Sequence, residues 1–374
     1  MPVWKDELNK LFTSNVELGD FYKEISHEGL VLYGAGAMGK MALDLLKQAD
    51  ISPKYIVDQK FSGNISGIEV ISPNDIPKND LDKLTFVVCI ASIPYEPIKD
   101  FLINLGCKDV RHFYDYSELK LNNIMGNGWF VPEFDNDEKK EIFSICEALE
   151  HDEKSIAHYL QFLWWRIRRK ELIYSKFPVI EDEKFFNFKN FPKLTEKEVF
   201  LDGGAHKGES IKKFIEKTKG EFAHIWAFEP DKNNFEQLKK NIGNLPSNIT
   251  MLDKAICGKC GHFKFQAELG YASQINENGP ETAESVTIDS MPEINPTIIK
   301  LHIEGSELDA LYGAKETIKK MRPVVMVLAD HNKDGLYKIP KFLMDQDNYK
   351  LFFNLHDYCG NSAVFYALPK ERIK

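Results

Sequence analysis

The sequence predicts an α/β protein: a seven-stranded open sheet, preceded by a smaller Rossmann-like α/β domain and a helical connector. Two strand–glycine–helix beginnings support this prediction, one near residue 30 and one near residue 199. Length and composition agree with it, because 374 residues suit two domains and 43% apolar residues can build packed cores. We place the three parts at residues 1–118, 119–197 and 198–374.

The first domain is expected to begin with a buried strand, Leu30–Tyr33, which leads through the turn Gly34-Ala-Gly-Ala-Met-Gly39 into a helix that runs to Lys47. Further strands are expected over Tyr55–Val57 and Thr85–Ile90, followed by a helical stretch after Pro97. This alternation of strands and helices is typical of a parallel sheet.

The connector has a different pattern. Its apolar positions recur at helical spacing, at Ile142, Ile145, Leu149, Ile156, Leu160, Leu163 and Ile167. We expect two helices with a break near His151. The second helix carries Trp164-Trp-Arg-Ile-Arg-Arg-Lys170, which either holds a diphosphate or, as we favour, turns its tryptophans inward and its arginines outward.

The second sheet is expected from apolar segments that alternate with helical ones. These are Val199–Leu201, Ile225–Phe228, Ile249–Leu252, Ile298–Ile303, Val324–Leu328, Tyr349–Phe353 and Ala363–Leu368. Only a short loop separates the last two segments, which predicts an antiparallel hairpin at one edge of an otherwise parallel sheet. A polar hairpin region is expected between Ala255 and Ser290.

Charge and composition argue against several classes of protein. The net charge is −9, whereas a protein that reads phosphate backbones needs a basic face. No apolar run reaches the ~18 residues of a membrane span, and charges stand where a secretory signal places its apolar stretch. We therefore expect a cytoplasmic protein with no nucleic-acid and no membrane partner.

The cysteines are too few and too scattered for a disulfide framework, so reduced thiols are expected. Cys257, Cys260 and His262 have the spacing of half a zinc site. Because no second pair of ligands follows them, we favour a turn between two strands and assign no metal ligands.

The strongest local signal for chemistry is Leu201-Asp-Gly-Gly-Ala-His-Lys-Gly208, where a strand ends at a carboxylate and glycines let the backbone approach a ligand. Glu229 ends the next strand, and a carboxylate there can accept both hydroxyls of a ribose. Asp202 would repel a pyrophosphate but would pair with an amino group, which favours S-adenosylmethionine over a dinucleotide. The alternative is a tight turn that binds nothing.

Several segments in this order carry a family resemblance: Phe200-Leu-Asp-Gly-Gly-Ala-His-Lys-Gly-Glu-Ser210, Phe228-Glu-Pro-Asp231, Thr287-Ile-Asp289, Lys300-Leu-His-Ile-Glu-Gly-Ser-Glu307 and Ala310-Leu-Tyr-Gly-Ala314. Residues from about 150 to 370 resemble the FkbM family of S-adenosylmethionine-dependent methyltransferases. The resemblance implies the seven-stranded class I methyltransferase sheet and methylation of a hydroxyl on a sugar or natural product. It implies that Asp202, Gly204 and Glu229 lie at the cofactor, with Gly203 and Gly208 in the same turn. Asp253, at the end of the third strand, is then an adenine-side contact.

One position departs from the family pattern, which usually reads K-x-D-I-E-G-x-E: His302 stands in place of the aspartate. An imidazole binds Mg²⁺ poorly but can accept a proton near neutral pH, so a requirement for a divalent metal stays open. We expect His302 or His331 to take the hydroxyl proton and Glu304 to position the acceptor. The alternative for either histidine is a structural hydrogen bond. Lys300 is expected to pair with Glu304 or Asp289.

The N-terminal glycine motif suggests a second nucleotide site. Gly34, Gly36 and Gly39 follow a strand and open a helix, and Asp58 ends the next strand, as in a dinucleotide fingerprint. The module is short for NAD, and its Tyr33-Gly-Ala-Gly36 and Gly67-Ile-Glu-Val-Ile-Ser72 segments resemble the small N-terminal domains of sugar acyltransferases, which bind a nucleotide-sugar. Three interpretations stay open: a nucleotide-sugar or other substrate, NAD, or a ligand-free packing or dimer surface.

Together these patterns predict an S-adenosylmethionine-dependent O-methyltransferase that acts on a sugar hydroxyl, in glycan or polysaccharide biosynthesis. The expected partner is a sugar or nucleotide-sugar substrate, and a homo-oligomer is left open. The rival interpretations are an NAD-linked oxidoreductase that uses the first glycine motif, and a non-catalytic protein that binds a nucleotide or nucleotide-sugar.

Overall fold

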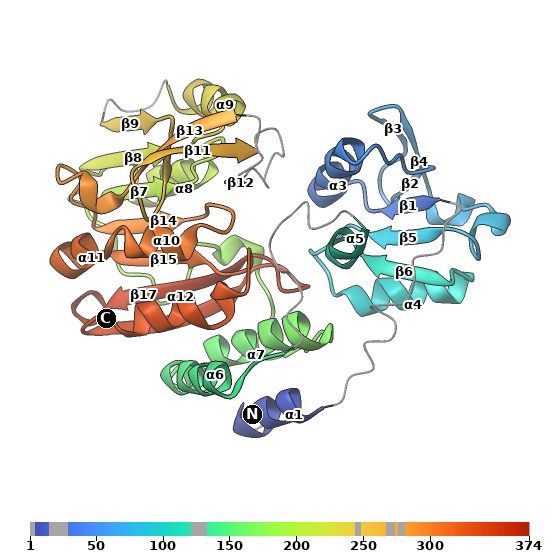
Figure 1. Cartoon of the computed structure of the whole chain (residues 1–374), viewed down its shortest axis with the longest axis horizontal. Coiled ribbons are helices and arrows are strands. Elements are labelled where there is room, and N and C mark those ends of the chain that lie inside the picture. The colour runs from blue at the N-terminus through green and yellow to red at the C-terminus, as the bar shows by residue number, and fades with distance from the viewer. Residues whose placement is uncertain are drawn as a thin grey trace.

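The computed structural model describes residues 4–14, 29–120, 133–243, 248–266, 274–275 and 281–373. Two α/β bodies lie side by side, and a helical part lies along one side of them (Figure 1). The smaller body holds a six-stranded sheet and the larger one a seven-stranded sheet with a four-stranded sheet beside it. The predicted fold class is confirmed.

The smaller body is a parallel sheet with one antiparallel edge strand, in the order β3-β4-β2-β1-β5-β6. Its elements are β1 (Leu30–Tyr33), α3 (Ala37–Gln48), β2 (Ile56–Val57), β3 (Gly63–Ile65), β4 (Ile68–Ile71), β5 (Thr85–Val88), α4 (Tyr95–Leu105), β6 (Asp109–His112) and α5 (Phe113–Lys120). Helices α3 and α5 pack on one face, and α4 packs on the other. Both faces of β1 and β5 are thus buried, which agrees with their unbroken apolar sequences.

The helical part consists of α1 (Trp4–Thr13), α6 (Asn136–Leu149) and α7 (Glu153–Arg168). The expected break between the two connector helices is present, and Asp152 caps the start of α7 by accepting a hydrogen bond from the amide of Ser155. Leu8 and Leu11 of α1 are buried against the same core as α6 and α7. Helix α1 therefore packs with the connector, although we had placed its residues with the first domain.

The seven-stranded sheet has the order β16-β17-β15-β14-β7-β8-β9. Its strands are β7 (Val199–Gly203), β8 (His224–Phe228), β9 (Ile249–Leu252), β14 (Ile298–Leu301), β15 (Val324–Leu328), β16 (Tyr349–Leu355) and β17 (Ala363–Pro369). The predicted edge hairpin is confirmed, since β17 runs antiparallel to both β15 and β16. Strand β14 ends at Leu301 rather than at the expected Ile303, because the chain turns there toward the next helix.

Helices cover both faces of this sheet. Helices α8 (Glu209–Thr218) and α9 (Lys232–Ile242) pack on one face. Helices α10 (Glu307–Tyr312), α11 (Lys315–Met321) and α12 (Asp334–Met344) pack on the other, together with α6 and α7. The side chains of each strand alternate between these two cores, as the period of a strand requires.

The expected polar hairpin region forms a separate small sheet, β10 (Lys254–Ile256), β11 (Gly261–Gln266), β12 (Gln274–Ile275) and β13 (Glu281–Val286), in which β11 pairs with β13 antiparallel. Cys257 and Cys260 lie between β10 and β11, in the predicted turn, and the cysteines are free thiols. Among the residues described, no helix is long and apolar enough to cross a membrane.

Helix α7 joins the two bodies. Its Trp165 contacts Tyr95 and His112 of the smaller body, with ring centroids 5.7 and 5.5 Å away. The prediction that the arginines of this helix point outward is wrong for Arg166 and Arg169. Arg166 is fully buried and donates to the carbonyl of Asp330 at 2.8 Å, and Arg169 pairs with Asp115 of α5 at 2.7 Å. The helix end is polar and buried because it fills the junction between the two bodies.

Candidate functional site

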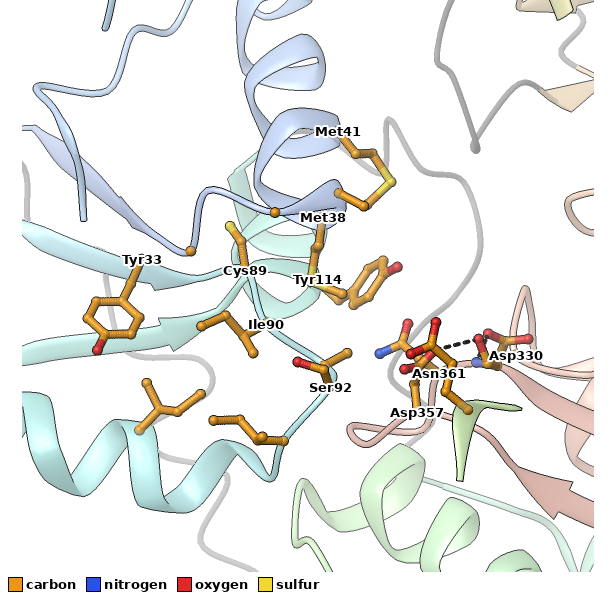
Figure 2. A pocket seen from close by; sticks show the side chains of 18 of the residues that line it. Tyr33, Met38, Met41, Cys89, Ile90, Ser92, Tyr114, Asp330, Asp357 and Asn361 are labelled. Carbon is orange, nitrogen blue, oxygen red and sulfur yellow. Dashed lines mark hydrogen bonds between the residues drawn. The ribbon is translucent and has the colours of Figure 1, made fainter. Parts of the chain in front are cut away.

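A cavity of about 670 Å³ lies between the two bodies and takes side chains from both. In Figure 2 the smaller body contributes Tyr33, Met38, Met41, Ile90, Ser92 and Tyr114 from one side, and Asp330, Asp357 and Asn361 face them from the other. Gly34, Gly36 and Asp58 line the same cavity, as do His302, Glu304 and His331. The two groups that the sequence suggested as separate sites therefore share one space.

The glycine turn after β7 lies against the chain that follows β14. Gly204 has a left-handed backbone (φ +74°), and a Cβ on it would lie 1.9 Å from the carbonyl oxygen of His302. Gly208 (φ +92°) precedes α8, where a Cβ would lie 2.7 Å from Ile242. Glycine is required at both positions by conformation and by space.

Glu229, at the end of β8, is held by the backbone. Its two carboxylate oxygens accept hydrogen bonds from the amides of His206 at 2.7 Å and Asp231 at 3.0 Å, one each. Each oxygen keeps acceptor capacity, so the side chain fits the two hydroxyls of a ribose. Burial raises the pKa of Glu229. Its contact with a cofactor stays a prediction, as does that of Asp253, which is exposed between β9 and β10.

Asp202 requires a correction. It is fully buried, and it forms an ion pair with Lys300 of β14 at 2.7 Å while it accepts a hydrogen bond from the hydroxyl of Ser210. The amino group that pairs with Asp202 is therefore the side-chain ammonium of Lys300. The expected partners of Lys300 were also wrong: Asp289 instead accepts hydrogen bonds from the amides of Glu316 and Thr317.

The ammonium of Lys300 also donates to the carbonyl of Gly204 at 2.7 Å. Asp202 and Lys300 thus act from beneath the glycine turn, and they fix the turn that would approach the cofactor. Gly203 ends strand β7, and a Cβ added to it would lie 3.0 Å from the side chain of Leu301. The residues present at this turn and at Glu229 fit S-adenosylmethionine.

His302, Glu304 and His331, our three candidate catalytic residues, are brought together by the parallel pairing of β14 and β15. One oxygen of Glu304 lies 3.2 Å from Nε2 of His302 and 3.5 Å from Nε2 of His331. The two imidazole rings stack with centroids 5.2 Å apart. Glu304 has a left-handed backbone (φ +53°), which is uncommon for a residue other than glycine and is found at functional sites.

The surroundings of His302 and His331 shift the pKa values of the two rings in opposite directions. Burial, assisted by the ammonium groups of Lys184 and Lys300, lowers the pKa of His302 well below its usual value. Burial also acts to lower the pKa of His331, but the carboxylates of Glu304 and Glu307 outweigh it and raise that pKa to about 10. With no cation bound beside them, these neighbours keep His302 as the neutral imidazole and stabilise a proton on His331.

Two further residues of the cavity were not predicted as site residues. Lys184 lies in the segment before β7, and burial lowers the pKa of its ammonium group. Asp330 follows β15 and is 6% exposed; one of its carboxylate oxygens accepts from the amide of Ser362, and the other has no hydrogen-bond partner among the residues described. Asp330 could have been suspected from its strand-end position, but no sequence motif marks Lys184.

The N-terminal glycine turn brings the start of α3 close to the end of β1. Gly34 has φ +117°, and a Cβ on Gly39 would lie 2.0 Å from the carbonyl of Gly34, so α3 starts close to β1. No atom lies within 4 Å of the place a Cβ would take on Gly36. Asp58 accepts hydrogen bonds from the amide of Ala35 at 2.8 Å and from two amides of its own turn, which lower its pKa although burial opposes them. Whether these residues bind a nucleotide stays a prediction.

The larger body has the strand order and the strand-end acids of a class I methyltransferase, the class that uses S-adenosylmethionine. Residues 202–354 match the Methyltransferase FkbM domain. The crystal structure of Methyltransferase FkbM from Methylobacillus flagellatus KT is similar over 97% of this chain and 98% of that one, with a TM-score of 0.66 and 19% identity. That likeness extends to the fold of both bodies.

A curated relative is similar over a shorter stretch. The Hexuronic acid methyltransferase AglP of Haloferax volcanii is 23% identical over 111 residues, which are 28% of this chain. The matched stretch spans 46% of the length of that relative.

Proposed function

We propose that the protein transfers a methyl group from S-adenosylmethionine to a hydroxyl of a sugar, and that this sugar lies in the cavity between the two bodies. One observation carries the proposal. His302, Glu304 and His331 stand at the ends of β14 and β15, beside the glycine turn of β7, and they line the same cavity as the glycine turn of β1.

Methyl transfer from a sulfonium needs an aligned hydroxyl and a place for its proton. The neutral imidazole of His302 can take that proton, and Glu304 and Asp330 offer carboxylate oxygens to neighbouring hydroxyls of a sugar. The printed name of the Haloferax relative, a hexuronic acid methyltransferase, supports a sugar as acceptor. An enzyme of this kind serves glycan or polysaccharide assembly.

A nucleotide-linked sugar suits the residues that line the cavity. Its diphosphate would meet the amides at the start of α3, where Gly36 leaves open space, and its sugar would extend toward His302. NAD would use the same turn, so the N-terminal glycines alone do not decide between these two ligands. Calorimetric titration with S-adenosylmethionine, NAD and a UDP-sugar, each alone, separates them. We expect binding of S-adenosylmethionine and of the UDP-sugar but not of NAD.

The cofactor half of the proposal is tested at Glu229. Replacing Glu229 with alanine removes two hydrogen bonds to a charged acceptor, so we expect the affinity for S-adenosylmethionine to fall at least about tenfold. Glu216→Ala, an exposed glutamate of α8, is the matched control and should bind normally. Unchanged affinity in a folded Glu229→Ala variant would contradict the proposed cofactor site.

The catalytic half is tested at His302. His302→Ala should bind S-adenosylmethionine with nearly normal affinity and transfer methyl groups slowly, because the imidazole meets the hydroxyl and not the cofactor. The measurement is release of S-adenosylhomocysteine with a panel of UDP-sugars and free uronic acids. Normal turnover in His302→Ala, combined with inactivity of His331→Ala, would move the role of base to the end of β15.

A further inference from the structure

We propose that His302, Glu304 and His331 bind one divalent transition-metal ion at the floor of the cavity. One ring nitrogen of each histidine and a carboxylate oxygen of Glu304 lie within 4.8 Å of one another. Two of the separations are 3.2 and 3.5 Å. Ligands bound about 2.1 Å from a metal ion in a tetrahedral arrangement lie about 3.4 Å apart, so the spacing fits three ligands of a single ion.

The next layer of contacts supports this assignment. Nδ1 of His331 lies 2.6 Å from a carboxylate oxygen of Glu307, which leaves Nε2 directed at Glu304. Glu307 is itself fixed, because its oxygens accept hydrogen bonds from the amides of Ile303 at 2.8 Å and Gly305 at 2.9 Å. Histidines that bind metals are oriented by a carboxylate on their second nitrogen in this way.

The charges around the three residues favour a cation. The carboxylates of Glu304, Glu307 and Asp330 all act on the ring of His331, whereas the ammonium groups of Lys184 and Lys300 lie on the side of His302. Asp330 adds an independent observation: it is nine-tenths buried, and one of its oxygens has no partner in the described part of the chain. A buried carboxylate oxygen of this kind requires a ligand, a cation or the water bound to one.

The ligand types select the class of ion. Two imidazoles and one carboxylate suit Zn²⁺, Co²⁺, Fe²⁺ or Mn²⁺, whereas Mg²⁺ prefers oxygen ligands alone. The sequence led us to assign no metal ligands, because His302 replaces an aspartate and an imidazole binds Mg²⁺ poorly. If the proposed function holds, a bound ion would take over the activating role assigned above to the free imidazole of His302. An acceptor hydroxyl at its open position would lose its proton to a cavity water more readily than in the free sugar.

Metal binding can be tested without any acceptor or cofactor. The full-length protein is stripped with a chelator and titrated with Co²⁺, whose visible absorption reports its ligands, and the binding of Zn²⁺ and of Mg²⁺ is measured by calorimetry. We expect one equivalent of Co²⁺ that is displaced by Zn²⁺ and not by millimolar Mg²⁺. The absorption spectrum should lack a thiolate-to-cobalt charge-transfer band, since the ligands are nitrogen and oxygen.

Variants assign the ion to its residues. His302→Ala, Glu304→Gln and His331→Ala should each weaken Co²⁺ binding at least tenfold, and Glu307→Gln should weaken it about 10- to 100-fold through the orientation of His331. His151→Ala removes an exposed imidazole outside the cavity, and Cys260→Ser removes one thiol of the Cys257–Cys260–His262 group. Both variants should bind Co²⁺ as the wild type does. Circular dichroism confirms that each variant is folded.

Two results would overturn the proposal. One is the absence of stoichiometric Co²⁺ and Zn²⁺ binding by the folded wild-type protein. The other is binding that survives in all three ligand variants or is lost in Cys260→Ser. Neither result bears on methyl transfer itself, which the assay with S-adenosylmethionine measures separately.

Discussion

The buried ion pair of Asp202 and Lys300 is the residue-scale feature on which the cofactor turn depends. Both side chains are nearly inaccessible, at 0% and 3% exposure, and the ammonium also holds the carbonyl of Gly204. A buried pair contributes little net stability compared with apolar residues, but the loss of one partner leaves an uncompensated buried charge. The pair therefore specifies the position of the turn more than it stabilises the fold.

We expect Asp202→Ala to lower the free energy of unfolding by about 3–5 kcal/mol, because it leaves the ammonium of Lys300 buried without a counter-ion. The double variant Asp202→Asn/Lys300→Met should recover most of that loss of stability. Its affinity for S-adenosylmethionine should nevertheless be lower than that of the wild type, because no ammonium group anchors the carbonyl of Gly204. Urea unfolding of the single and double variants measures the effect. A double variant no more stable than Asp202→Ala would show that the charge is not the cause.

Gly204 permits a prediction with a matched control. Gly204 and Gly220 both have left-handed backbones, with φ +74° and +79°, but only Gly204 has no room for a Cβ. Gly220→Ala should cost about 1–2 kcal/mol for the backbone conformation alone. Gly204→Ala should cost a further ~1–3 kcal/mol, because its methyl group meets the carbonyl of His302 and something must shift. Equal unfolding midpoints for the two variants would contradict the close approach.

Sequence reasoning located the residues of the cofactor turn but not their partners. Asp202 and Glu229 could be predicted because each ends a recognisable strand. The Asp202–Lys300 pair could not, since it depends on register: β7 and β14 pair so that Lys300 stands opposite Asp202. The register between two parallel strands that are far apart in the chain depends on how both faces of the sheet pack. The local sequence of either strand does not reveal that packing.

At the scale of the element, α7 is the helix that differs most from its prediction. Every residue from Ser155 to Ile167 is buried, including His158, Gln161 and Arg166. The helix was predicted correctly from its apolar spacing, yet its polar side was placed in solvent. That side is covered by the smaller body and by the β16–β17 hairpin, and such covering depends on tertiary contacts that helical periodicity cannot reveal.

His158 makes α7 sensitive to acid. Its Nδ1 accepts from the amide of Leu355 at 3.0 Å, and its Nε2 donates to the carbonyl of Phe177 at 3.0 Å. The contact with Leu355 requires the neutral ring. Burial lowers the pKa of His158 to about 4, against about 6.5 in the unfolded chain. As the pH falls from 6.5 toward 4, only the unfolded state takes up this proton, so stability is lost in that window and not above it.

We therefore expect His158→Gln, whose amide can make the same two contacts, to flatten the decline of stability with acid. Between pH 6 and 4.5 the slope of the unfolding free energy should be shallower than in the wild type by up to about 1.4 kcal/mol per pH unit. Urea unfolding at several pH values measures it. His262→Gln, an exposed histidine of β11, is the control. Parallel slopes for His158→Gln and the wild type would show that His158 titrates normally.

At the scale of the whole molecule, the two bodies form one site. The sequence predicted both sheets and both glycine turns, but it assigned them to separate nucleotide sites. The structure places the glycine turn of β1 and the ends of β14 and β15 around one cavity. The two bodies meet because α7 docks on both of them and because the chain after β16 reaches the smaller body, where the amide of Tyr358 donates to the carbonyl of Ala91 at 2.7 Å. The relative placement of two domains depends on such contacts, which leave no periodic trace in either sequence segment.

Trp165 lies at the centre of this junction, where its ring packs against the smaller body and Arg169 lies 5.9 Å from the ring centroid. Its side chain is fully buried against Tyr95 and His112, while its indole nitrogen has no hydrogen-bond partner among the described residues. Truncation to alanine should cost about 3–5 kcal/mol at the contact between the bodies rather than within either sheet. Because the cooperative unfolding of two domains depends on their interface, we expect one calorimetric transition in the wild type and two in Trp165→Ala.

The same variant separates the roles of the two bodies. S-adenosylmethionine should bind Trp165→Ala with nearly normal affinity, because Gly204 and Glu229 belong wholly to the larger body. Methyl transfer should fall, because the acceptor needs both walls of the cavity. Trp165→Phe keeps an aromatic ring and loses no hydrogen bond, so it should restore one transition and most of the activity. A single transition with full activity in Trp165→Ala would mean that the cavity is held together by contacts other than this ring.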